Sequence, residues 1–357
     1  MNRKDRVLNS IMHKGIDRVP LMYRALPDIN TKLLKYFHLD PDINKSWQKL
    51  MEVMGFDLFS GGNGIGKFTK FKPSYLGKLN QNPLDTNLFY TFGIKSYYDE
   101  ISNSINYKVN KDFAKLSTIS EVSKYCFPSP LDFDYEWINP PLHLKDICFL
   151  GVGTLNSIFM IALYLRGVEQ LMLELLTNKK LAKYYIDRIG EFVLEFSKRT
   201  FQNTKDYIEF FAVWDDLAMQ NGLMIPYYSF KEFFYPWYKK IFTLAREYNL
   251  ITYFHICGSA IEIIPDLIDI GVEILDPVQV SAKYMQLDLL KKKYGRNICY
   301  HGGIDVQNML PFKKAKEIKD YIKRVVDIFG TSGGIILGPS HEIMVDTPIE
   351  NILAIYS

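Results

Sequence analysis

The stretch TYFHICGSAIEIIPDLIDIGVEILDPVQ, residues 252–279, contains one full unit of the pattern that governs the second half of the chain. A short apolar run ends in polar residues and a glycine, a helical pattern follows over 259–270, and a second apolar run begins at 272. Strands that alternate with helices through short connections are typical of a parallel sheet with helical crossovers. The stretch therefore predicts an α/β fold.

The same order recurs on both sides of this stretch. Eight segments read as buried strands, and helical patterns follow most of them: 17–23, 55–62, 146–153, 210–216, 251–258, 272–279, 297–305 and 333–341. The clearest helical patterns cover 4–13, 157–199, 230–248, 284–294, 315–329 and 347–356. Eight strands with helical crossovers are the composition of a (β/α)₈ (TIM) barrel. We expect residues 1–357 to form one such domain.

The front half of the chain is more elaborate than the back half. Between residues 67 and 140 the composition becomes polar and aromatic, and the helical and strand periodicities weaken. We interpret this segment as an insertion with a hairpin and a short helix, packed over one face of the barrel.

Composition excludes several classes of function. The net charge of +3 and the absence of a dense lysine or arginine run argue against a nucleic-acid-binding protein. No run approaches the roughly 20 apolar residues of a membrane span, and no targeting segment is recognisable at the start. Four dispersed cysteines predict a reduced, cytoplasmic protein without a disulfide framework. The oligomeric state stays open, with a homodimer as one alternative.

Polar residues gather where the predicted strands end, which is where barrel enzymes carry their active sites. The candidates are Arg24, Asp57, Asp215, Asp216, His255, Cys257, Asp276, Gln279, His301, Asp305 and His341. Within this set His255, Cys257 and His341 are side chains of the types that bind zinc. They follow different strands, so a barrel would bring them to the same face.

Each candidate also has a structural alternative. His255 and Cys257 are compatible with packing in a strand, and His301 with a hydrogen bond to a backbone carbonyl. Asp276 precedes Pro277 and fits a turn, while Asp215 and Asp216 fit caps of the following segment. The residues alone leave these alternatives open.

Four segments carry a resemblance to a known family: AVWDDLAMQNGLMI (212–225), FHICGSAIEIIPDLIDIGVEILDPVQV (254–280), YGRNICYHGGIDVQNMLPF (294–312) and GGIILGPSHEIMVDTPIENILA (333–354). They resemble the uroporphyrinogen decarboxylase (URO-D) superfamily, and a looser likeness extends to the amino terminus. The resemblance implies a TIM barrel. It also implies one of two chemistries, metal-free decarboxylation of a porphyrinogen or zinc-dependent methyl transfer from a corrinoid protein.

The methyltransferase branch is the closer of the two in its motifs. His255 and Cys257 match its His-x-Cys pair, and His341 in GPSH stands where that branch has a later cysteine. The resemblance implies zinc on these three residues with an open position. A methyl-corrinoid on a separate partner protein would be the donor, and a thiol or pterin the small-molecule acceptor.

Other polar strand ends receive supporting roles in this interpretation. Asp215 or Asp216 would orient the acceptor or complete the zinc shell, and Asp276 and Gln279 would hydrogen-bond a ligand imidazole. Substrate contacts are expected from Arg24, Gln279, His301 and Asp305.

The decarboxylase branch is the alternative. Asp57 in GFDLFS would then stabilise the cationic intermediate, and Arg24 would hold substrate carboxylates. However, YRALPDINTKL (23–33) retains only this one arginine where the true decarboxylases have an arginine-rich stretch. A third alternative is a non-catalytic barrel that binds a tetrapyrrole or a corrinoid protein.

Overall fold

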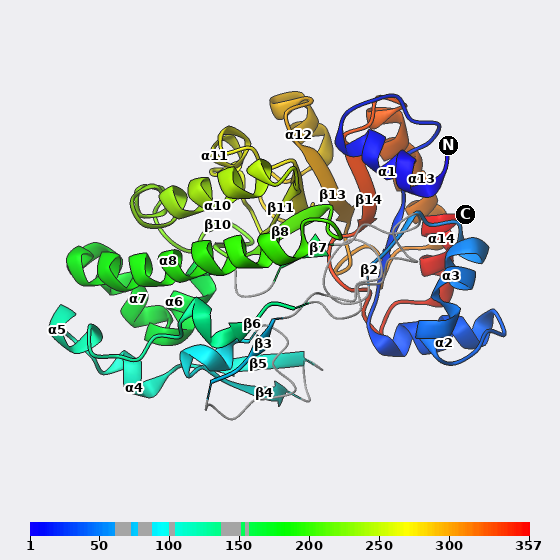
Figure 1. Ribbon diagram of the computed structural model, residues 1–357. Helices are drawn as coiled ribbons and strands as arrows, with labels where there is room; N and C mark the ends of the chain where they lie inside the picture. Colours follow the sequence, from blue (N-terminus) through cyan, green and yellow to red (C-terminus); the bar gives the residue numbers. More distant parts are fainter. Residues whose placement is uncertain (61–72, 78–87, 100–103, 137–150, 154–156) are drawn as a thin grey trace.

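The computed structural model describes residues 1–60, 73–77, 88–99, 104–136, 151–153 and 157–357. Eight short parallel strands lie at its centre (Figure 1). They are β1 (Met22–Arg24), β2 (Leu58–Ser60), β7 (Gly151–Val152), β8 (Phe210–Trp214), β11 (Ile251–His255), β12 (Ile274–Val278), β13 (Cys299–Ile304) and β14 (Ile335–Pro339). Each falls within or beside one of the eight predicted segments, of which 146–150 lies outside the described residues.

Pairing places the strands in barrel order. Six of them form one sheet in the order β14-β13-β12-β11-β8-β7, and β1 pairs with β2 in parallel. Parallel bridges from Leu21 to Leu337 and from Ala25 to Ile343 join the β1 segment to the β14 segment. The resulting series, from β2 through β1 and β14 to β7, is that of a (β/α)₈ barrel, so the predicted fold class is confirmed.

Apolar side chains fill the inside of the barrel. A separate core cluster unites inward-facing residues of seven strands with one face of helix α1 (Arg3–Ile11). Its buried members are Val7, Ile11, Met22, Leu58, Phe210, Ala212, Tyr253, Ile274, Cys299 and Ile336. Helix α1 contacts β14, and the Ser10 hydroxyl donates to the carbonyl of Ile335, the first residue of that strand. Because β14 starts there, α1 closes the amino-terminal end of the barrel.

Helices surround the strands on the outside (Figure 1). They are α2 (Pro27–Tyr36), α3 (Ile43–Met54), α6 (Ile158–Arg166), α7 (Val168–Thr177), α8 (Lys179–Thr204), α10 (Tyr235–Glu247), α11 (Ile264–Asp269), α12 (Leu287–Tyr294), α13 (Ala315–Phe329) and α14 (Ile349–Tyr356). Helix α13 shows why they pack as they do. Its buried residues Ile318, Val325 and Phe329 are spaced by seven and four, which puts them on one face of a helix.

Helix α11 is shorter than the pattern predicts. The apolar periodicity suggests a start near Ser259, whereas the helix begins at Ile264 with Pro265 in its first turn. Proline lacks the N–H that a helix interior requires, so it is tolerated only in the first turn. Residues 261–263 form a turn instead.

The region predicted as an insertion, 67–140, is described in part. It contains the antiparallel pair β3 (Ser74–Tyr75) and β6 (Phe133–Asp134), and the hairpin of β4 (Lys95–Asp99) and β5 (Ser104–Lys108). The short helices α4 (Lys111–Ala114) and α5 (Ile119–Val122) follow, and they contact α6 and α8 respectively. Residues 67–72, 78–87, 100–103 and 137–140 of this region lie outside the described residues.

Within the described part of the chain, no helix combines the length and the apolar composition needed to cross a membrane.

Candidate functional site

The barrel interior is polar at the carboxyl ends of its strands, which we call the upper end, and it is apolar nearer the amino-terminal ends. Side chains two residues apart in a strand face the same side. When a core residue faces the barrel interior, the polar or aromatic residue two positions later therefore faces the interior as well. These pairs are Met22 and Arg24, Ala212 and Trp214, Tyr253 and His255, Ile274 and Asp276, and Cys299 and His301. We call Arg24, Trp214, His255, Asp276 and His301 the upper layer.

Asp276 lies at the centre of the upper layer. Its side chain is fully buried, and its two oxygens lie 2.5 Å from Nδ1 of His255 and 2.5 Å from Nδ1 of His301. Register explains the first contact, because His255 and Asp276 are paired neighbours on β11 and β12. Asp276 is therefore hydrogen-bonded to a neighbouring imidazole, which donates to the carboxylate, and this pairing agrees with the prediction.

This contact fixes the orientation of His255. An ionised carboxylate only accepts hydrogen bonds, so Nδ1 of His255 carries the proton and Nε2 is left to bind a cation. Burial acts to raise the pKa of Asp276, but His301 and His255 outweigh it and hold that pKa well below its usual range. The Trp214 ring packs on the other side of His255, with ring centroids 4.4 Å apart.

Two further potential cation ligands lie beside Nε2 of His255. Cys257 Sγ lies 3.6 Å from His255 Nε2, and Asp216 Oδ1 lies 3.9 Å from the same nitrogen. The three ligand atoms all lie within 4.8 Å of one another. We call Asp216, His255 and Cys257 the cation group.

The cation group suits zinc in its chemistry, and the two distances from His255 Nε2 are close to those of a zinc site. Zinc binds thiolate, imidazole and carboxylate at about 2.0–2.3 Å in a tetrahedron, whose ligands are then about 3.3–3.8 Å apart. The sulfur-to-nitrogen distance of 3.6 Å falls in this range, and the nitrogen-to-oxygen distance of 3.9 Å is close to it. The Asp216 side chain is 43% exposed, so the group is open on one side, as a fourth position for a substrate requires.

Electrostatics also favour a cation here. Burial acts to lower the pKa of His255, but Cys257 and the Asp276 carboxylate outweigh it and raise that pKa to about 10. A surplus of negative charge therefore holds a proton on His255 that a metal ion would displace.

The loop that carries Cys257 is tightly held. Asp216 Oδ1 accepts from the Cys257 N–H at 2.9 Å, and Gln279 Oε1 accepts from the Gly258 N–H at 2.9 Å. Gly258 has a φ of +87°, and a Cβ there would lie 2.6 Å from the carbonyl oxygen of Met219. Gln279 thus bonds the backbone beside Cys257, whereas we predicted a bond to a ligand imidazole.

His341 lies outside the cation group in the described structure. His341 is exposed in the turn after β14. The third ligand position beside His255 and Cys257, which we predicted for His341, is occupied by Asp216. Partial desolvation, with the charges of Arg24 and His255, lowers the pKa of His341 to about 4. The imidazole is therefore neutral and close enough to the upper layer to sense its charges.

Asp215, predicted as catalytic, has a structural position. It is fully buried and accepts from the N–H groups of Ile158, Phe159 and Met160, the first three residues of α6. Its Oδ2 also accepts from the Tyr238 hydroxyl at 2.6 Å. Burial raises the pKa of Asp215 to about 7 against these bonds. Asp215 therefore caps a helix, but that helix is α6, which precedes it in the chain, and not the following segment that the capping alternative named. Its neighbour Asp216 faces the cation group.

Asp57 lies at the opposite end of the barrel from the upper layer. It precedes β2, and its carboxylate accepts from Arg6, from Arg18 and from the N–H of Leu21, which precedes β1. The expectation that Asp57 lines the active site is therefore wrong. The prediction failed because β2 is an apolar strand with polar residues nearby at both ends, and the sequence alone does not show at which end of the strand Asp57 lies.

Asp305 stabilises its own turn. Its carboxylate accepts from the N–H groups of Gln307 and Asn308 and from the side-chain amide of Asn308. The structure therefore shows a local role for Asp305, and its contact with substrate stays a prediction. His301 and Arg24, in contrast, belong to the upper layer as inward-facing residues.

Two features of the site went unpredicted. Trp214 and Tyr253 were not among the candidates, although the alternation within 210–214 and 251–255 puts them on the same face as the interior residues. The second feature is the contact of Asp276 with both His255 and His301, which depends on a strand register that the sequence does not specify.

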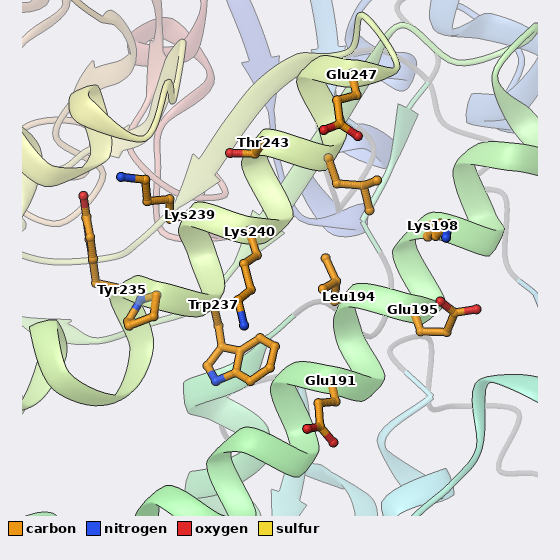
Figure 2. Close-up of a pocket in the computed structure, with 12 residues that line it drawn as sticks. Glu191, Leu194, Glu195, Lys198, Tyr235, Trp237, Lys239, Lys240, Thr243 and Glu247 are labelled. Carbon is orange, nitrogen blue, oxygen red and sulfur yellow. The ribbon is translucent and has the colours of Figure 1, made fainter.

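Two hollows that are lined by described residues lie apart from the upper layer. A groove of about 950 Å³ lies between α8 and α10, with Leu194, Trp237 and Lys240 among its lining residues (Figure 2). A second hollow of about 670 Å³ is lined by residues 219–227 and Glu262. It adjoins the Cys257 loop, because the Ser259 N–H donates to the Met219 carbonyl.

Comparisons with known proteins agree with this architecture. Over 207 residues the chain is 24% identical to the methylated-thiol–coenzyme M methyltransferase of Methanosarcina mazei, a match covering 57% of this chain and 51% of that protein. The chain thus matches about half the length of this relative. A solved methyltransferase from Methanosarcina mazei superposes with a TM-score of 0.63 at 15% identity, covering 99% of this chain and 97% of the other.

The family model for uroporphyrinogen decarboxylase (URO-D) matches residues 148–357, which include the whole cation group and every residue of the upper layer except Arg24. This match covers more than half of the chain and agrees with the resemblance inferred from the sequence. The chain belongs to the URO-D family.

Proposed function

We propose that this protein is a zinc-dependent methyltransferase that moves a methyl group from a methyl-corrinoid, carried by a separate protein, to a thiol or pterin acceptor. The observation that carries the proposal is the cation group, in which a carboxylate, an imidazole and a thiol lie within 4.8 Å of one another at the open end of the barrel. The methyltransferase relatives support the same class of reaction.

His255, Cys257 and Asp216 would hold the metal. Zinc bound there would favour the thiolate form of an acceptor at neutral pH. The protein residues have their own tasks. Asp276 keeps the proton of His255 on Nδ1, so that Nε2 faces Cys257. Trp214 packs on the imidazole ring and restricts its rotation.

The reaction balances for a thiol acceptor. The thiol proton leaves to solvent and the sulfur forms a bond to the methyl carbon. The cobalt–carbon bond of the methyl-corrinoid donor would break, and its electron pair would remain on the corrinoid. We further propose that residues 67–140 are an insertion in a single domain spanning 1–357, and that this insertion influences which acceptor is used.

Decarboxylation receives no comparable support. Its expected carboxylate, Asp57, is bonded to Arg6 and Arg18 at the amino-terminal end of the barrel. A non-catalytic barrel would have no requirement for a converging carboxylate, imidazole and thiol.

Elemental analysis tests the proposal directly. Protein purified without a chelator or a metal-binding tag should contain about one zinc per chain. The variant Cys257→Ser should lose it, while Cys126→Ser, which alters an exposed cysteine remote from the site, should retain it. A protein that stays metal-free after reconstitution with zinc under reducing conditions contradicts the proposal.

A further inference from the structure

Asp215 joins two helices to the end of β8, directly before a residue of the cation group. Its two oxygens accept from three N–H groups at the start of α6 and from the Tyr238 hydroxyl of α10, at 2.6–2.8 Å. A capping side chain commonly binds one N–H group of its own helix. Asp215 binds three in a helix that precedes it, together with a hydroxyl from another helix. These bonds hold the strand end as well as the helix end.

The backbone beside Asp215 is held too. Its N–H donates to the His255 carbonyl at 3.0 Å, and the Ser157 hydroxyl donates to the Trp214 carbonyl. The end of β8 is thus bonded to the end of β11 on one side and to the residue before α6 on the other. Asp216 therefore extends from a backbone that is fixed in two directions.

Asp216 itself has few bonds in the described structure. Its side chain is 43% exposed, and the hydrogen bond described for its carboxylate comes from the Cys257 N–H at 2.9 Å. The accepting atom, Oδ1, is also the one that lies 3.9 Å from His255 Nε2. A partly exposed side chain with one bond takes its direction largely from its own backbone. Asp215, one residue earlier, is the main anchor of that backbone.

Tyr238 contributes to this anchor from outside the barrel. It is fully buried, and its ring packs edge-on against Phe254, with ring centroids 5.3 Å apart. Phe254 precedes His255 on β11, so the strand that carries one cation ligand holds the tyrosine ring. The hydroxyl at the other end of the ring donates to Asp215 at 2.6 Å. Tyr238 therefore connects the backbones that carry His255 and Asp216.

We propose that Asp215 and Tyr238 are positioning residues that fix the carboxylate of Asp216 within the cation group. Neither residue belongs to the cation group, so each would act on the metal only through Asp216. The inference rests on the proposed function, because it concerns the geometry of the metal site. It predicts that the loss of one buried hydroxyl in α10 changes how the site binds a metal ion.

The first test is Tyr238→Phe, which removes the hydroxyl and keeps the ring. We expect about 10-fold weaker zinc binding, as is typical when a partner of a ligand is lost, measured by chelator competition. Cobalt(II) bound in place of zinc should show a shifted visible spectrum, because this spectrum depends on the ligands and their geometry. Tyr235→Phe is the matched control. It removes a hydroxyl of the same helix that bonds Asp269, and it should leave both readouts unchanged.

A second measurement separates positioning from a general loss of stability. If Tyr238 acts through Asp216, then adding Tyr238→Phe to Asp216→Asn should weaken zinc binding no further. Asp215→Asn should behave like Tyr238→Phe in the same cycle, and thermal unfolding shows whether each variant is folded.

Additive effects in this cycle overturn the inference. Wild-type zinc affinity with an unchanged cobalt spectrum in folded Tyr238→Phe overturns it as well, and both results leave the zinc-dependent function intact. A wild-type protein that binds neither zinc nor cobalt contradicts the proposed function and the inference together.

Discussion

At the scale of single residues, we expect substitutions of Asp216 and of His341 to affect zinc binding differently. Asp216 contributes an oxygen to the cation group, whereas His341 is exposed in the turn after β14. We expect Asp216→Asn to lower zinc affinity strongly, because an amide is a poor zinc ligand compared with a carboxylate. His341→Ala should keep about one zinc per chain. Competition with a chromophoric chelator measures both affinities.

The reverse result would be equally informative. If His341→Ala loses zinc and Asp216→Asn retains it, then the ligand set is the one predicted from the GPSH motif. The turn after β14 would then have to move toward His255 when the metal binds.

Asp276 supports the site through His255. Replacing it with asparagine substitutes an amide for the carboxylate that accepts from two imidazoles, so the Nδ1 proton of His255 is no longer fixed. Loss of such a supporting carboxylate typically costs about 10- to 100-fold in metal affinity. Asp276→Asn should therefore bind zinc about 10- to 100-fold more weakly, again by chelator competition. Wild-type affinity in a folded variant would show that His255 does not depend on Asp276.

The sequence was sufficient to single out His255 and Cys257, because two soft ligands at a strand end stand out from an apolar background. It was not sufficient to separate Asp215 from Asp216. Consecutive residues at a strand end point in different directions, and only the tertiary structure shows that Asp215 caps α6. The sequence also placed Asp276 correctly as a partner of an imidazole, since its strand follows that of His255.

At the scale of elements, the loop between β11 and α11 depends on Gly258. Its φ of +87° is strained for other residues, and a Cβ would lie 2.6 Å from the Met219 carbonyl oxygen. We expect Gly258→Ala to lower the free energy of unfolding by about 1–3 kcal/mol and to weaken zinc binding, because Cys257 would be displaced. Urea denaturation measures the first effect and chelator competition the second.

Gly15→Ala is the matched control for that experiment. A Cβ at Gly15 meets no atom within 4 Å, and its φ lies outside the left-handed region. The change should stay within about 0.5 kcal/mol of wild type. If the two variants are equally stable, then the loop accommodates a side chain and the strain argument fails.

Helices and strands were predictable from the sequence where their apolar residues follow a regular period. The strand segments alternate with helices often enough for all eight to be located, and Pro265 alone displaced the start of α11. Weak periodicity in 67–140 gave no comparable guide, because the short elements there are held by aromatic contacts between distant residues, such as Phe133 of β6 with Phe192 of α8.

At the scale of the whole molecule, the two ends of the barrel differ in role: the candidate site lies at the carboxyl ends of the strands, and a network of stabilising hydrogen bonds lies at the opposite end. The upper layer and the cation group hold buried polar atoms with spare bonding capacity. The lower end holds Asp57, whose oxygens accept from Arg6, Arg18 and the Leu21 N–H at 2.5–2.9 Å. Sequence could not assign Asp57 to the lower end, because that assignment depends on where β2 starts relative to a polar residue one position earlier.

This division makes Asp57 a test of the whole scheme. Removal of Asp57 takes a buried acceptor away from Arg6, Arg18 and the Leu21 N–H, so Asp57→Ala should lower the free energy of unfolding by about 3–5 kcal/mol. Asp17, 43% exposed and bonded to the same Arg6, is the matched control, and Asp17→Ala should cost about 0–1 kcal/mol. Urea denaturation at pH 7 gives both values. Folded Asp57→Ala should retain full zinc content and acceptor binding, since the upper end is untouched. If this variant is instead as stable as wild type but inactive, Asp57 acts on a substrate and the decarboxylase alternative regains its carboxylate.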